Sequence, residues 1–97
     1  MANQPNYRSE TLMLRKVAND ARCRWEFRTH ALKELTKDNR TAADVQYALM
    51  TNSQVTLHEL KRDLLWRAEG KDLDGKRIQV VVAVFEAVPK IKVITAF

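Results

Sequence analysis

An almost unbroken apolar run over residues 78–85 predicts a strand at the centre of a β-sheet. The run reads IQVVVAVF, and apolar side chains on both parities are typical of a strand covered on both faces. Asp74 and Gly75 precede it, and a glycine at this place is a strong signal for a hairpin turn. Residues 64–71 alternate before the turn and are expected to pair with the run, and residues 91–97 form a further strand after it. The C-terminal part of the chain therefore predicts an antiparallel meander.

The first sixty residues carry helix and strand signals in turn. Apolar residues near helical spacing predict a helix over residues 10–19, and strict alternation predicts a half-buried strand over residues 22–28. A second helix is expected over residues 31–37, and a third from a capping box at residues 41–44 to about residue 50. A strand over residues 54–60 then leads into the meander.

Together these elements predict one α+β domain that spans residues 1–97. We expect an antiparallel sheet of four to five strands, ending in the C-terminal meander, with two to three helices packed mainly on one face. A chain of 97 residues is long enough to bury a single core. Residues 1–20 are expected to be a helical extension, which packs on the edge of the α+β core formed by residues 22–97.

Composition restricts the partners and the compartment. The chain has 17 Lys and Arg against 12 Asp and Glu, and the formal net charge of +5 favours polyanions, RNA first, or an acidic protein partner. A single cysteine allows no intrachain disulfide, so we expect a cytoplasmic protein. No apolar segment approaches the roughly 20 residues that span a bilayer, so no membrane partner is expected.

The sequence indicates neither a metal site nor a cofactor. Cys23, His30 and His58 lack the clustered spacing of zinc ligands. With Gly70 and Gly75 as the only glycines, the chain has no glycine-rich phosphate loop.

Cleavage of RNA without a metal needs a base, a cation that stabilises the phosphate, and an acid for the leaving oxygen. His30 is the first candidate for base or acid, because it lies at a strand-to-helix junction and histidine titrates near neutrality. A capping or packing histidine is the alternative. Arg67 lies on the opposite parity from Trp66 and is a candidate phosphate ligand, with a cross-strand ion pair as the alternative. Arg40 is a further candidate cation.

Several other residues are candidates for contacts with RNA. The alternation of residues 54–60 puts Val55 and Leu57 on one face and Thr56 and His58 on the other, so His58 is expected on the polar face, where it is either an RNA ligand or a solvated residue. The full set of RNA-binding candidates is Arg24, Arg28, His58, Lys61 and Arg62. The aromatic residues considered as stacking platforms are Tyr7, Trp25, Tyr47 and Trp66, of which both tryptophans have the parity of core residues.

A series of short motifs runs through residues 25–97. Thr29-His30-Ala31 follows a strand, Asp44-Val45 opens the second of two helices, and Val93-Ile94-Thr95 ends the meander after a Gly-containing turn and a Val-rich strand. In this order the motifs resemble the small DUF4258-type domains, which are similar in turn to RelE-like toxins and to metal-free ribonucleases such as barnase and the colicin nucleases. The resemblance implies an α+β sheet whose open face binds RNA, with possible cleavage. It makes Thr95 a candidate phosphate ligand, with an ordinary β-branched strand residue as the alternative.

Three interpretations follow. The first is a metal-independent endoribonuclease toxin that an antitoxin holds in check. The second is a catalytically inactive module that binds RNA or protein, favoured by Glu34 and Asp38, which stand where DUF4258-type sequences usually carry basic residues. The third is a homodimer built through the terminal strand, residues 91–97, whose apolar edge would otherwise be exposed.

Overall fold

The computed structural model describes residues 7–60 and 64–97 and confirms an α+β fold. Three helices and five strands follow one another along the chain. Their bounds are α1 (Arg8–Ala18), β1 (Arg24–Phe27), α2 (Thr29–Lys37), α3 (Ala42–Thr51), β2 (Gln54–Leu60), β3 (Leu64–Lys71), β4 (Arg77–Phe85) and β5 (Lys90–Ala96).

The strands form one sheet in the order β1-β5-β4-β3-β2, with β4 at its centre as expected. Strands β2 to β5 are the antiparallel meander. The sheet as a whole is mixed, because β1 pairs in parallel with β5, with Trp25 opposite Ile91 and Phe27 opposite Val93. Since β5 lies between β1 and β4, the expectation that residues 91–97 form an exposed edge is wrong.

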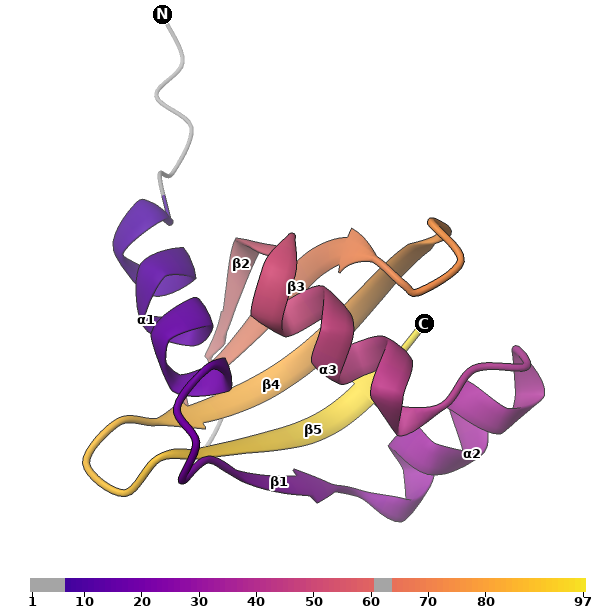
Figure 1. Ribbon diagram of the computed structural model, residues 1–97, viewed down its shortest axis with the longest axis horizontal. Helices are drawn as coiled ribbons and strands as arrows, with labels where there is room; N and C mark the ends of the chain where they lie inside the picture. Colours follow the sequence, from indigo (N-terminus) through magenta and orange to yellow (C-terminus); the bar gives the residue numbers. More distant parts are fainter. Residues whose placement is uncertain (1–6, 61–63) are drawn as a thin grey trace, which may run out of the picture.

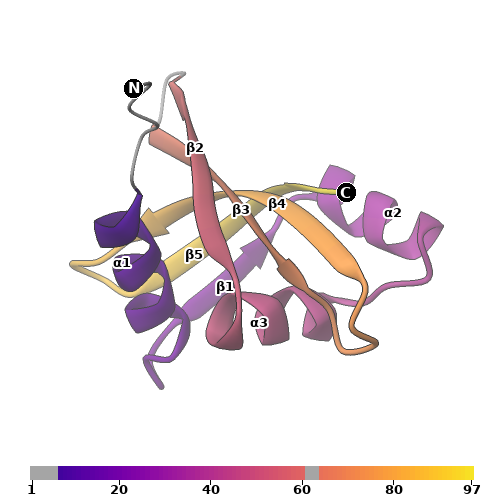
Figure 2. The ribbon, with the colours of Figure 1, turned by 90° about the horizontal axis from the view of Figure 1, so that it is seen from above.

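The helices leave one face of the sheet without a helical layer. Helices α1 and α3 lie on the same face, and α2 lies past the end of β1, beside β5 (Figures 1 and 2). Leu14, Val17 and Ala18 of α1 are buried in the same core cluster as the inner residues of the strands. Helix α1 is therefore an integral part of the core.

Strand β4 is buried on both of its faces. Ile78, Val80 and Val82 belong to the core under the helices, while Val81 and Ala83 are buried on the opposite face. Burial on both faces explains why residues 78–85 are apolar at both odd and even positions, as the sequence predicted.

A β-bulge in β2 reverses one expectation. Val55 is opposite Ala68, but the next paired residue is Leu57, opposite Arg67, so Thr56 is the extra residue of the bulge. Val55 is buried and Leu57 is exposed. The prediction that these two side chains share a face is therefore wrong, because the bulge shifts the parity of the strand.

Helix α3 begins at the expected capping box. The Thr41 amide donates a hydrogen bond to Asp44 Oδ2 at 2.9 Å. Asp44 Oδ1 also accepts a hydrogen bond from the Leu73 amide at 3.1 Å, which ties the start of α3 to the β3–β4 turn.

Candidate nucleic-acid interface

The face of the sheet opposite α1 and α3, called here the open face, carries alternate residues of each strand. Their positions follow from the strand register and from the parity of the buried core residues. The residues of the open face whose side chains the structure describes are Arg24 and Glu26 on β1, Lys90, Lys92 and Thr95 on β5, Arg77, Gln79, Val81, Ala83 and Phe85 on β4, Leu65, Arg67, Glu69 and Lys71 on β3, Leu57 on β2, and Phe97 after β5.

Two of the predicted catalytic residues lie in one row across this face. Arg67 on β3 is opposite Val81 on β4, and Val81 is in turn opposite Thr95 on β5. Two strand spacings separate the Cα atoms of Arg67 and Thr95, about 10 Å. A guanidinium and a hydroxyl that flank a small apolar residue at this separation can approach one phosphate group from two sides.

Basic side chains outnumber acidic ones on the open face. Among the side chains that the structure describes, the basic ones on this face are Arg24, Arg67, Lys71, Arg77, Lys90 and Lys92, and the acidic ones are Glu26 and Glu69. Both carboxylates are near cations, Glu26 at 3.8 Å from Lys90 Nζ and Glu69 at 2.7 Å from Arg77 Nε. The hydrogen bond from Arg77 lowers the pKa of Glu69, so this carboxylate stays ionised at neutral pH. The charge that remains on the face is positive.

His30 is exposed in the first turn of α2, the helix that packs along β5. The N-cap of α2 is Arg28, which is also exposed. Within residues 7–60 and 64–97, the side chain of His30 makes neither a hydrogen bond nor an ion pair. Its imidazole is exposed to solvent, and it neither packs in the core nor caps the helix.

Arg40 has a different position from the other candidates. Its Nε lies 3.0 Å from Asp72 Oδ2, its terminal amine donates to the Arg77 carbonyl, and only 14% of its side chain is exposed. The guanidinium therefore joins the α2–α3 connection to the β3–β4 turn. Of the predicted RNA contacts, the side chain of His58 and residues Lys61 and Arg62 lie outside the described part of the chain.

The aromatic residues of the open face are ones that the sequence analysis missed. Trp66 is buried, as expected, and Trp25 is half-buried and stacks on Phe27 at 6.5 Å between ring centroids. Phe85 and Phe97 are 42% and 43% exposed. Phe85 has the parity of Val81 and Ala83 on β4, and Phe97 follows Thr95 on β5 and lies opposite Gln79.

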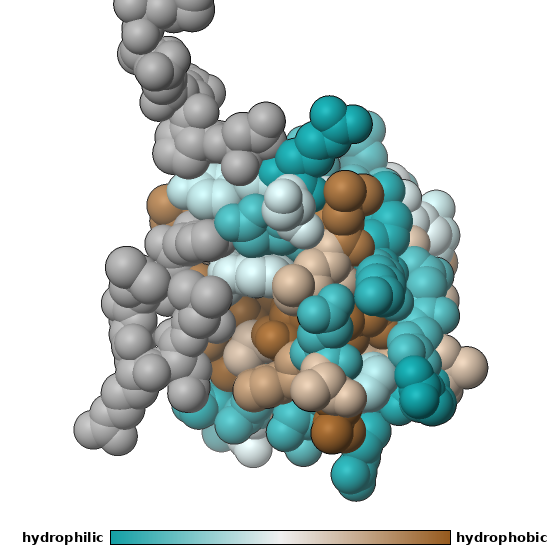
Figure 3. Space-filling view, turned by 90° about the vertical axis from the view of Figure 1, so that its left-hand side faces the viewer, coloured by the Kyte–Doolittle hydropathy of each residue, from teal (hydrophilic) through white to brown (hydrophobic). Residues whose placement is uncertain are grey.

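One end of the molecule adds to the accessible apolar surface. Apolar side chains gather between hydrophilic ones at the end formed by α1 and the β4–β5 turn (Figure 3). Leu12 of α1 and Val88 of the turn are exposed, and so is Phe85, the last residue of β4. The ring of Phe85 is thus reachable from solvent.

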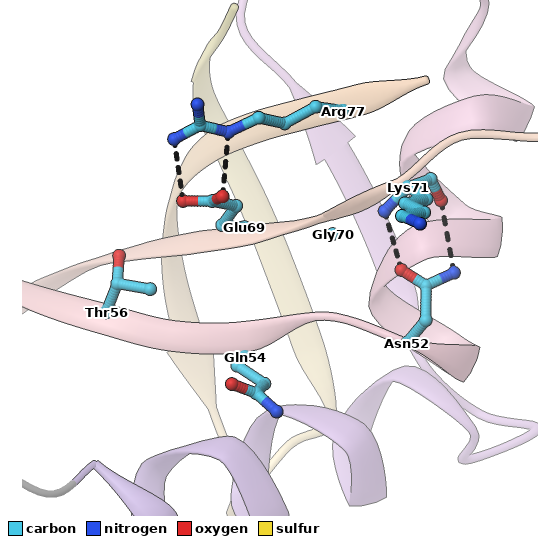
Figure 4. A pocket seen from close by; sticks show the side chains of 7 residues that line it. All are labelled: Asn52, Gln54, Thr56, Glu69, Gly70, Lys71 and Arg77. Carbon is cyan, nitrogen blue, oxygen red and sulfur yellow. Dashed lines mark hydrogen bonds and ion pairs between the residues drawn. The ribbon is translucent and has the colours of Figure 1, made fainter. Parts of the chain in front are cut away.

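A pocket of about 610 Å³ lies where β2 begins beside β3. Its lining consists of Asn52, Gln54, Thr56, Glu69, Gly70, Lys71 and Arg77 (Figure 4). The Lys71 amide donates to Asn52 Oδ1 at 2.6 Å, and Asn52 Nδ2 donates to the Lys71 carbonyl at 3.1 Å. Because Glu69 and Arg77 are also paired with each other, these contacts hold the wall of the pocket together.

The described residues limit two further possibilities. No helix among them is long and apolar enough to cross a membrane. In the same part of the chain, no three His, Cys, Asp or Glu side chains are grouped so that they could hold a metal ion.

Comparison of the chain with protein-family models, with curated proteins and with solved structures gives no match. The geometry of the open face is therefore the basis on which a function can be assigned.

Proposed function

We propose that this protein binds RNA through the open face of its sheet. The observation that carries the proposal is the excess of basic side chains on a face that α1 and α3 leave uncovered. Lys and Arg that neutralise phosphates supply most of the sequence-independent affinity for nucleic acids. RNA in particular offers single-stranded segments whose bases can lie on a sheet that carries aromatic side chains.

The second candidate function is that of a metal-independent endoribonuclease, as in RelE-like toxins. It is favoured by the shared row of Arg67 and Thr95 and by the exposed His30 on α2, the helix that contacts β5. In this mechanism His30 takes the proton of a 2′-hydroxyl, whose oxygen attacks the neighbouring phosphorus. The bond from phosphorus to the 5′-oxygen breaks, that oxygen takes up a proton from water, and the products are a 2′,3′-cyclic phosphate and a 5′-hydroxyl.

In that mechanism Arg67 and Thr95 stabilise the charge that develops on the phosphate. Arg40 does not take part, because its guanidinium is bound to Asp72 and to the Arg77 carbonyl. Such an enzyme would act in the cytoplasm, and an acidic antitoxin would be suited to cover its basic face. RNA binding without cleavage is the simpler proposal, since it needs only the charge of the face.

One experiment separates the two functions. The purified protein and a His30→Ala variant are incubated with a mixed-sequence RNA, with and without EDTA, at low salt. Cleavage that persists in EDTA and disappears in the variant supports the enzyme. Intact RNA that is retained at low salt and released at high salt supports the binding protein. Absence of both cleavage and retention would refute both functions.

A further inference from the structure

On the open face, each of two exposed phenylalanine rings contacts the cationic group of a basic side chain. Arg67 Cζ lies 5.1 Å from the centroid of the Phe97 ring, and Lys90 Nζ lies 4.7 Å from that of the Phe85 ring. Such cation–π contacts fix the orientation of a ring and keep a positive charge next to it. Each site therefore combines a π surface with a cation, and at the Phe85 site Lys90 also lies 3.8 Å from Glu26, from which a phosphate would have to draw it.

The two rings mark opposite ends of the β4–β5 pair. Phe85 is opposite Lys90 in the register, and Phe97 exchanges two backbone hydrogen bonds of 2.7 Å with Gln79. Phe85 is six residues after Gln79 on β4, which corresponds to about 20 Å along the strand. The positions between them on the open face are Val81 opposite Thr95 and Ala83 opposite Lys92.

This spacing fits a short single strand. A stacked strand advances about 3.4 Å per nucleotide, so roughly six nucleotides would reach from one ring to the other. A strand with splayed bases needs fewer. In a duplex the bases are stacked within the helix and cannot lie on either ring, whereas single strands are typically bound by stacking on aromatic side chains above a basic groove.

We infer that Phe97 and Phe85 are two stacking platforms at the ends of a path for single-stranded RNA, with Arg67 and Lys90 placed to contact the phosphates beside the stacked bases. The inference rests on the proposed RNA function and adds to it the class of RNA and the length of the site. Lys92 and Thr95 lie between the platforms, where the strand passes. Stacking of this kind is tolerant of sequence, because every base has a π surface.

The test measures the affinity of the full chain for 2′-O-methyl oligouridylates of two, four, six and eight nucleotides and for an eight-base-pair RNA duplex. These oligonucleotides cannot be cleaved by attack of a 2′-hydroxyl. The variants are Phe97→Leu and Phe85→Leu, which keep an apolar side chain and lose the π surface, with Phe97→Tyr as the conservative variant. Leu12→Ala on α1 is the control for an exposed apolar residue away from the open face.

The affinity of the wild-type protein is expected to rise with length up to about six nucleotides and then to level off. Each Phe→Leu variant should bind the eight-nucleotide strand roughly ten-fold more weakly, and the double variant roughly a hundred-fold more weakly. Phe97→Tyr and Leu12→Ala should retain the wild-type affinity. The duplex should bind more weakly than the single strand.

Failure of this inference differs from failure of the proposed function. If the wild-type protein binds RNA but both Phe→Leu variants bind it equally well, the platforms are refuted and the RNA function stands. Equal affinity for the duplex and the single strand would also refute the platforms and leave the RNA function standing. If the wild-type protein binds none of these RNAs at low salt, the proposed function is refuted together with the inference.

Discussion

Arg40 and Asp72 form a buried ion pair, with 3.0 Å between Nε and Oδ2, that joins the α2–α3 connection to the β3–β4 turn. The exposed fractions of the two side chains are 14% and 2%. Asp72 Oδ1 also accepts hydrogen bonds of 2.9 Å from the amides of Asp74 and Lys76. A single carboxylate thus organises the hairpin turn and fastens it to the helical layer.

Replacement of Arg40 should therefore destabilise the fold. In Arg40→Ala the carboxylate of Asp72 stays buried without its cation, and loss of one partner of a buried pair costs about 3–5 kcal/mol. Urea denaturation measures the change in the free energy of unfolding. Arg22→Ala is the matched control, because Arg22 pairs with Asp20 at 3.1 Å on the surface, and its loss should change stability by less than about 1 kcal/mol. Equal effects of the two substitutions would contradict the structural role of Arg40.

The same carboxylate should make stability depend on pH. Burial alone would raise the pKa of Asp72, but hydrogen bonds from the Lys76 amide and the Arg40 guanidinium outweigh burial and hold the pKa below the ordinary 3.8. A lowered pKa stabilises the folded state above the ordinary value, and this stabilisation is lost as the pH falls through the pKa of the folded state. The test compares urea midpoints of the wild-type protein and Asp72→Asn from pH 7 to pH 2. The difference should stay constant down to about pH 4 and shrink below it, whereas a constant difference throughout would count against the prediction.

Helix α1 should be required for stability. Leu14 is fully buried in the core cluster, and truncation of a buried leucine to alanine costs about 2–5 kcal/mol. On the same helix, Leu12 is 63% exposed, so Leu12→Ala should change the free energy of unfolding by no more than about 0.5 kcal/mol. Both values come from urea denaturation. A small effect of Leu14→Ala would indicate that α1 is an addition at the edge, as the sequence analysis supposed.

Gly70 should be intolerant of a side chain for a steric reason. A Cβ at this position would lie 2.5 Å from Asn52 Oδ1 and 3.0 Å from the Cα of Ser53, so the α3–β2 junction would have to move. Gly70→Ala should destabilise the protein by about 1–3 kcal/mol, as overpacking does. Gly75 has open space but a φ of 77°, which asparagine tolerates, so Gly75→Asn should cost clearly less. Thermal unfolding of the two variants gives the order, and a reversed order would refute the steric argument.

Local patterns predicted most elements of this fold. The capping box at Thr41, the Gly75 hairpin turn and the apolar run of β4 each have a short-range physical cause, and each lies where the sequence indicated. The parallel pairing of β1 with β5 is different, because it joins residues about seventy positions apart and no alternation reports it. The bulge at Thr56 could not be predicted from the sequence either, since it changes the parity of β2 without changing its composition.

The candidate site was predictable only in part, for the same reason. Parity placed Arg67 away from Trp66, and the structure has Arg67 on the open face. That Arg67 and Thr95 share a row depends on the register of three strands, which the sequence does not contain. Arg40 was a candidate cation because of its charge, and its burial against Asp72 follows from a contact between distant turns.

The salt dependence of RNA binding should locate the charges that contact phosphate. Each phosphate contact with a single strand contributes about −0.7 to the slope of log affinity against log salt concentration. Lys92 lies on the open face between the two phenylalanines, so Lys92→Gln should reduce the magnitude of the slope by about 0.7. Lys16 belongs to α1, where it pairs with Glu86 at 3.5 Å, so Lys16→Gln should leave the slope unchanged. The slopes of the wild-type protein and of the two variants are measured by fluorescence anisotropy. The probe is a labelled eight-nucleotide RNA, at roughly 50 to 300 mM KCl. If Lys16→Gln reduced the slope as much as Lys92→Gln, the charge of the whole surface, and not the open face, would attract the RNA.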